Sequence, residues 1–156
     1  MTATMEDTIN TLHVQRDIVI AAPQDITFES ILEELGPGSE GPDGKPFPMK
    51  IEAWPGGRWY RDLGKNVGHL WGHVQVIKPP ALLELYGPMF MSFPATNFVQ
   101  YRLKAEGDGT RLTITHRAMG LIPQEHIDGV GQGWEHGLKR IRDLAQRRLD
   151  ARRKSS

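Results

Sequence analysis

The chain has 156 residues, which is the length of one ordinary domain with one hydrophobic core. Its 19 basic and 19 acidic residues balance, so no overall field attracts nucleic acid, and the absence of cysteine excludes disulfides and thiolate chemistry. No apolar run approaches the roughly 20 residues that a membrane-spanning helix needs. We expect a soluble, cytoplasmic protein with no cofactor, no bound metal, no nucleic-acid partner and no membrane insertion.

The N-terminal part predicts a flexible tail over 1–10, then a strand and a short helix. Apolar and polar residues alternate over 12–21, which is typical of a half-buried strand. Pro23 suits the first turn of a helix, and apolar residues then recur at helical spacing as far as Leu35. A loop rich in glycine and proline follows over 36–48.

The middle of the chain predicts about six strands, over 49–53, 58–63, 67–77, 82–86, 96–105 and 110–116. Their hairpin-length connections require antiparallel pairing. In the third of these strands, alternation places Leu70 and Val74 towards the core and His69, Trp71 and His73 towards solvent. The two histidines would lie roughly 13 Å apart along the strand, too far to share one metal ion.

One long helix is predicted from Pro123 onward, and glycines crowd its first half. Each of Gly129, Gly131, Gly133 and Gly137 costs about 1 kcal/mol relative to alanine in a helix. A stripe without side chains lets a helix lie close to a sheet or leaves space beside it. We expect these glycines to serve close contact with the sheet, and Trp134 to lie beside a cavity.

These elements predict an α+β fold in which a curved antiparallel sheet of about six to seven strands grips the long C-terminal helix, with a short helix after the first strand. A single domain would cover 11–150, and 151–156 would form a basic tail. A nucleic-acid-binding role for that tail is disfavoured because no aromatic residue interleaves with its charges.

No apparent catalytic set stands out. The carboxylates, Glu34 among them, fall on polar faces or loops, and we assign no role to His126 or His136. His116 follows Leu112 and Ile114 at strand period, so its side chain should point towards the helix. It is either a buried structural histidine or a polar contact inside a pocket.

Five segments in order carry a resemblance: Ile18–Pro23, Pro55–Trp59, Gly72–Val74 running to Pro79-Pro80, Gly109–His116, and Gly133-Trp134. The series resembles the SRPBCC superfamily of START-like, birch-pollen-allergen-like proteins. Within it, the chain is most similar to the C-terminal domain of activators of the ninety-kilodalton heat-shock chaperone's ATPase. The resemblance implies a helix-grip fold with a hydrophobic cavity. The chain departs from it at Phe28, where relatives often carry tryptophan, and in the long loop over 36–48.

We predict non-catalytic binding of a small hydrophobic or amphipathic molecule, lipid-like or aromatic, between the sheet and the last helix. Two alternatives stay open: an enzyme of the polyketide cyclase or dehydratase type, and a module that acts on a chaperone. Its protein partner would be a chaperone or a second copy of the same chain in a homodimer. The predicted cavity lining is Phe28, Ile51, Trp59, Leu70, Leu85, Phe90, Phe93, Tyr101, Ile114, His116, Trp134 and Leu138.

Overall fold

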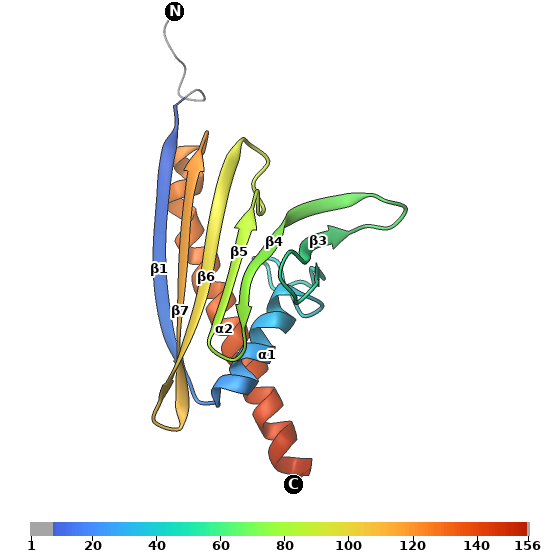
Figure 1. Cartoon of the computed structure of the whole chain (residues 1–156), viewed down its shortest axis with the longest axis vertical. Coiled ribbons are helices and arrows are strands. Elements are labelled where there is room, and N and C mark those ends of the chain that lie inside the picture. The colour runs from blue at the N-terminus through green and yellow to red at the C-terminus, as the bar shows by residue number, and fades with distance from the viewer. Residues whose placement is uncertain (1–7, 156) are drawn as a thin grey trace, which may run out of the picture.

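Seven antiparallel strands form one curved sheet that wraps around the long C-terminal helix (Figure 1). The computed structural model describes residues 8–155. The sheet order is β1-β7-β6-β5-β4-β3-β2. The elements are β1 (Asn10–Ile20), α1 (Gln24–Leu35), β2 (Lys50–Ile51), β3 (Arg58–Asp62), β4 (Gly68–Lys78), β5 (Leu82–Gly87), β6 (Ala95–Glu106), β7 (Gly109–Gly120) and α2 (Gln124–Ser155).

This architecture confirms the predicted α+β helix-grip fold, and the elements agree with their predicted places except at the ends. Residues 151–155 continue α2 where the sequence predicted a tail. The predicted flexible segment over 1–10 falls mostly outside the described residues, and β1 already begins at Asn10. No helix within the described part of the chain is long and apolar enough to cross a membrane.

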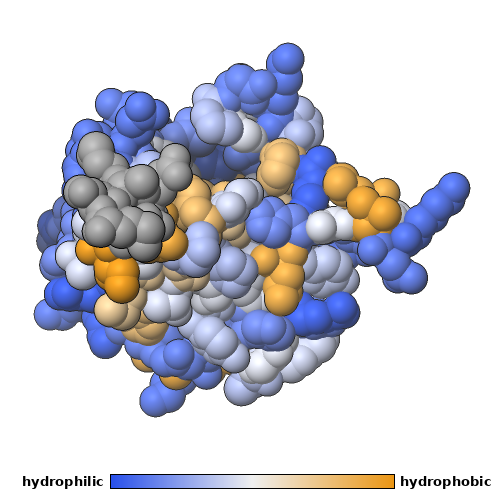
Figure 2. Space-filling view, turned by 90° about the horizontal axis from the view of Figure 1, so that it is seen from above, coloured by the Kyte–Doolittle hydropathy of each residue, from blue (hydrophilic) through white to orange (hydrophobic). Residues whose placement is uncertain are grey.

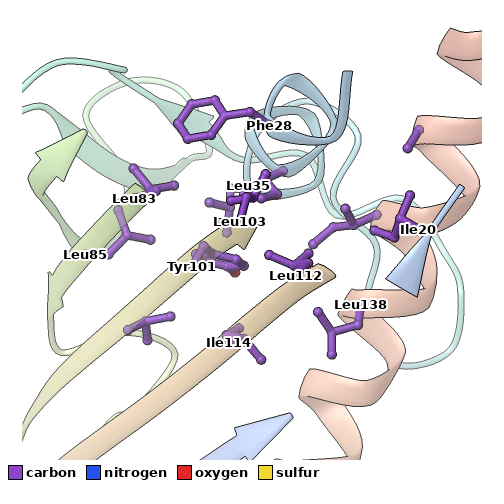
Figure 3. Packing of buried hydrophobic residues seen from close by; sticks show 14 of the residues in the cluster. Ile20, Phe28, Leu35, Leu83, Leu85, Tyr101, Leu103, Leu112, Ile114 and Leu138 are labelled. Carbon is purple, nitrogen blue, oxygen red and sulfur yellow. The ribbon is translucent and has the colours of Figure 1, made fainter. Parts of the chain in front are cut away.

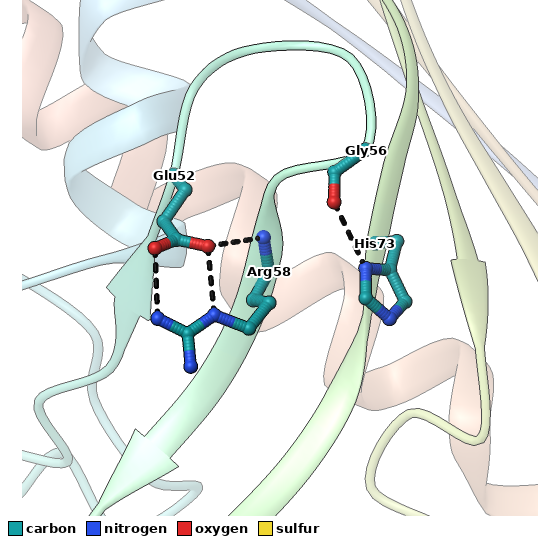
Figure 4. A network of polar contacts seen from close by, with 4 residues as sticks. All are labelled: Glu52, Gly56, Arg58 and His73. Atoms are coloured by element: carbon teal, nitrogen blue, oxygen red, sulfur yellow. Dashed lines mark hydrogen bonds and ion pairs between the residues drawn. The ribbon is translucent and has the colours of Figure 1, made fainter.

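The strand predicted over 49–53 is shortened to Lys50–Ile51. Beyond it, the Arg58 backbone N–H bonds to the Glu52 side chain instead of a backbone carbonyl. The carboxylate of Glu52 accepts the backbone N–H of Arg58 at 2.8 Å and two further bonds from its guanidinium (Figure 4). His73 braces the same turn, with its Nδ1 lying 3.0 Å from the carbonyl oxygen of Gly56. The turn between β2 and β3 is therefore held both by these side chains and by backbone hydrogen bonds, among them that from Glu52 N–H to the Arg58 carbonyl at 2.8 Å.

A β-bulge in β4 reverses the predicted alternation. Trp59 pairs with Gly72 and Tyr60 pairs with Leu70, so Trp71 is an extra residue between them. Such an insertion shifts the side chains before it to the opposite face. The prediction for Leu70 was therefore wrong, since its side chain is 44% exposed, whereas Trp71 packs against the core.

The hairpin of β3 and β4 projects from the rest of the molecule as an arm (Figure 1). Apolar side chains are visible on this arm in the space-filling view (Figure 2), and Leu63, Val67 and Leu70 are exposed there. We call these three residues the hairpin patch.

The core fills the space between the sheet and the two helices. Phe28, Tyr101, Ile114 and Leu138 lie together in it, each at most 4% exposed (Figure 3). A smaller cluster, which includes Leu12, lies at the other end of the sheet. Phe90 and Trp134 are partly buried against both clusters. They therefore lie at the boundary between the two clusters, which we call the seam.

Candidate ligand-binding site

A pocket of about 490 Å³ opens at this seam. It lies between the N-terminal half of α2, the end of α1, the loop over 36–48 and the aromatic residues of β3 and β4. Another hollow, of about 550 Å³, lies between α1 and the C-terminal end of α2. Among the described residues it has no wall of aromatic rings, and two of its charged residues, Arg152 and Asp25, already pair at 3.0 Å. The aromatic-lined pocket is therefore the better candidate for a small molecule.

The glycines of α2 form one wall of the pocket. Gly129, Gly133 and Gly137 recur every four residues and therefore share a face of the helix. A Cβ atom at Gly129 or Gly133 would meet no other atom within 4 Å. The expectation that these glycines serve close contact with the sheet is therefore wrong for both positions. They leave open space, and only Gly131, on another face, is crowded, by the Arg16 side chain.

Four aromatic rings from separate segments, Phe47, Trp59, Trp71 and Phe90, line the opposite side. Trp71 is central, with ring centroids 5.1 Å from Trp59, 5.7 Å from Phe90 and 6.0 Å from Phe47. Phe90 lies 6.3 Å from Trp134 on α2. Edge-to-face and tilted contacts at these distances are favourable between aromatic rings, so the wall is built to keep its shape.

All three pocket tryptophans donate their indole N–H to the protein itself. Trp59 donates to the Leu35 carbonyl at 2.7 Å, which satisfies a carbonyl at the end of α1. Trp71 donates to His69 Nδ1, and Trp134 donates to His116 Nδ1, each at 3.0 Å. What remains for a ligand is the apolar surface of the rings.

His116 is a fixed, neutral support for Trp134. Its Nδ1 accepts from the indole, so its Nε2 carries the proton and donates to Asn97 Oδ1 at 2.6 Å. The Asn97 amide nitrogen lies 3.2 Å from the Pro88 carbonyl, which fixes the orientation of the amide. Burial, with a smaller contribution from His126, lowers the pKa of His116 to about 4. Both ring nitrogens are engaged, so the side chain positions Trp134 rather than moving protons.

Glu34 presents an unpaired carboxylate to the pocket. It lies in the last turn of α1, and a Cβ at Gly137 would sit 3.6 Å from its Oε1. Within residues 8–155 it makes no hydrogen bond and no ion pair. Burial raises its pKa to about 7, against a lowering influence of Arg140 and with a further increase from Glu40. The carboxylate is thus costly to ionise in the empty pocket.

A second polar atom in the pocket wall also lacks a partner. The Nε2 of His126 is buried and makes no hydrogen bond within the described residues. Its ring lies 5.4 Å from Phe90, and burial lowers its pKa. A buried polar atom without a partner costs free energy.

The predicted cavity residues divide into four groups. Trp59, Phe90 and Trp134 line the pocket, and Leu70 is exposed. Ile51 and Phe93 are partly buried beside the two apolar clusters. The remaining six are buried in the packed interior: Phe28, Leu85, Tyr101, Ile114, His116 and Leu138.

The pocket residues that the predicted lining left out include Glu34, Phe47, Trp71 and His126. Phe47 had a usable signal, because a lone aromatic residue in a glycine- and proline-rich loop needs somewhere to pack. Glu34 directly precedes the apolar Leu35, at the edge of the apolar stripe of α1. Trp71 was hidden by the bulge, which no residue pattern announces.

A family model described as "Activator of Hsp90 ATPase homolog 1-like protein" matches residues 45–146. No curated protein sequence matches the chain significantly.

Solved structures share the fold at low sequence identity. An uncharacterized protein from Rhizobium leguminosarum is 17% identical with a TM-score of 0.69, covering 90% of this chain and 97% of that one. CalU16 from Micromonospora echinospora is 21% identical with a TM-score of 0.58, covering 92% and 95%. Ara h 8.0201 is 13% identical with a TM-score of 0.63, covering 88% and 99%. These similarities establish the fold and leave the ligand open.

Proposed function

The chain belongs to the activator of Hsp90 ATPase homolog 1-like family, and we propose that within this family it is a binding protein for a small apolar or amphipathic molecule held in the aromatic pocket. The observation that best supports this proposal is the row of glycines, Gly129, Gly133 and Gly137, on the pocket-facing side of α2. Gly129 and Gly133 each cost α2 about 1 kcal/mol of helix stability, and no packing contact requires either of them. Keeping the pocket open is a function that accounts for that cost.

The lining supports a ligand with an apolar body. A volume of about 490 Å³ is within the range of small-molecule sites, and its walls combine aromatic rings with a few polar groups. Because the three indole N–H groups are already bonded within the protein, the ring surfaces offer apolar contact. A ligand with an aromatic or aliphatic body fits that wall.

Filling the pocket from the glycine stripe tests the proposal. The neutral apolar dye Nile red should bind the wild-type protein and be displaced by the natural ligand. Gly133→Leu should weaken dye binding at least about tenfold, because the new side chain enters the space that the ligand needs. Gln132→Leu is the matched control, since it adds the same side chain one residue away and outside this pocket. No dye binding to the wild type, or equal binding to both variants, would contradict the proposal.

A cyclase-type reaction in this domain would need polar groups such as His116 and Tyr101 to steer it. The His116 nitrogens are both engaged, and Tyr101 is 1% exposed in the interior. Neither is presented to a bound molecule. We therefore place binding ahead of turnover.

A chaperone-directed role is the second candidate, because of the family to which the chain belongs. The hairpin patch is the exposed apolar surface that such a contact would use. The chain should then stimulate the ATPase of its host's Hsp90-type chaperone, and Val67→Ser should reduce that stimulation while leaving dye binding intact. An unchanged ATPase rate would exclude this role.

A further inference from the structure

The free polar groups of the pocket are matched to a ligand that donates hydrogen bonds. The indole N–H groups of the three pocket tryptophans already donate hydrogen bonds to Leu35, His69 and His116. Among the described residues, the charged side chains that line the pocket are all acidic: Glu34, Glu40 and Glu125. Glu40 forms an ion pair with Arg140, whose Nε lies 3.6 Å from its Oε1, whereas Glu34 forms no ion pair within residues 8–155. The Glu34 carboxylate is left as an acceptor without a donor.

The aromatic wall, like the Glu34 carboxylate, favours a positively charged ligand. The π-faces of tryptophan and phenylalanine carry partial negative charge, and they attract a cation within about 6 Å, most strongly where water is excluded. Phe47 already shows this behaviour, with the Arg61 guanidinium carbon 3.8 Å from its ring centroid. Trp59, Trp71, Phe90 and Trp134 make no such contact within residues 8–155.

We propose that the ligand of this pocket is an organic cation, an amine or ammonium group on an apolar or aromatic body, whose charge lies against the Glu34 carboxylate and the surrounding ring faces. This inference rests on the proposed binding function and specifies its ligand class. It disfavours fatty acids and other anions, since they would place a further negative charge among the lining carboxylates.

The affinity for such a cation should rise with pH. Glu34 faces Arg140 of α2 and Glu40 of the loop, and it also acts on the Tyr101 hydroxyl of β6. With its pKa at about 7, the ionised fraction of Glu34 in the empty pocket rises from about a tenth at pH 6 to about nine tenths at pH 8. Cation binding should therefore tighten about tenfold across that range, whereas a neutral ligand should not respond.

Three probes with one common ring system separate these possibilities: naphthylmethylammonium, naphthylmethanol and naphthoate. Calorimetric titration of the full chain at pH 8 should give at least about tenfold tighter binding for the ammonium than for the alcohol, with naphthoate weakest. Equal binding of all three, or tightest binding of naphthoate, would overturn the inference. If neither these probes nor Nile red binds, the proposed binding function itself fails.

A pair of neighbouring variants then assigns the preference to one carboxylate. Glu34→Gln should remove the preference for the ammonium over naphthylmethanol, and with it the pH dependence of ammonium binding. Glu33→Gln is the matched control, because Glu33 pairs with Arg148 at 2.6 Å and does not line the pocket. Persistence of the ammonium preference in Glu34→Gln would overturn the role of Glu34. The pH series on the wild type tests the same claim without any substitution.

Discussion

Glu34 and His116 show how burial sets charge at the scale of single residues. Both side chains lie where water is scarce, and burial favours the neutral form of each. The consequences differ because their partners differ. His116 is held by Asn97 and Trp134, whereas Glu34 has no hydrogen-bond partner among the described residues. His116 therefore stabilises the fold, whereas the Glu34 carboxylate is available to a ligand.

Glu34→Gln should stabilise the ligand-free protein at high pH and not at low pH. A carboxyl group whose pKa is raised by folding favours the folded state when it is protonated, and this contribution is lost as the pH rises from about 4.5 towards 7 and above. The variant should gain about 1 to 3 kcal/mol over wild type at pH 8 and almost nothing at pH 4. Urea unfolding at both pH values measures the difference. The same gain at both would contradict a partly buried Glu34 that ionises between these pH values.

His116 should remain neutral well below the pKa of a free histidine. Its folded-state pKa of about 4 is depressed, so its contribution to stability is present above about pH 6.5 and is lost as the pH falls towards 4. Nitrogen chemical shifts in an NMR titration should report the tautomer protonated at Nε2 at pH 5.5. A midpoint near 6.5 for this ring would show that the Asn97–His116–Trp134 arrangement does not hold in solution.

At the scale of elements, α2 combines two different faces along one helix. Leu138, Ile141 and Leu144 are buried against the sheet and α1, which gives the helix its place in the fold. The face with Gly129 and Gly133 lacks side chains and borders the pocket. Because tertiary packing supplies most of a helix's stability, the anchored half can tolerate glycines in the other half.

Gly133→Ala should therefore stabilise the protein by about 0.5 to 1 kcal/mol, since the added methyl group meets no atom within 4 Å and alanine favours the helix. Gly131→Ala provides the comparison within the same helix. Its methyl group would lie 2.6 Å from Arg16 Nη2 and would displace a guanidinium that pairs with Glu135 at 3.1 Å. Its gain should be smaller. Denaturant unfolding ranks the two, and a destabilised Gly133→Ala would show that the glycine is needed for packing.

At the scale of the whole molecule, the pocket joins parts that are distant in sequence. The end of α1, the loop over 36–48, β3 and β4 and the first half of α2 each contribute to its wall. A ligand there contacts all of them together. Binding should consequently stabilise the fold as a unit rather than one element alone.

Naphthylmethylammonium at about a hundredfold its dissociation constant should stabilise the protein by about 2.7 kcal/mol. For a domain of this length, that corresponds to a rise in the thermal midpoint of roughly 5 to 10 °C. Differential scanning calorimetry measures it, and Gly133→Leu should show no comparable rise at the same ligand concentration. An equal rise in that variant would place the binding site elsewhere.

The sequence by itself determined the order of the elements, the antiparallel pairing and the helix that the sheet grips. These follow from local periodicity, from turn residues and from connections too short for any other pairing. Only the tertiary structure decided which residues border the pocket. The extra residue in β4 turned Trp71 inward and Leu70 outward, and the empty space beside Gly133 depends on how far α2 stands from the aromatic wall. Both depend on distances between segments remote in sequence, which local patterns do not encode.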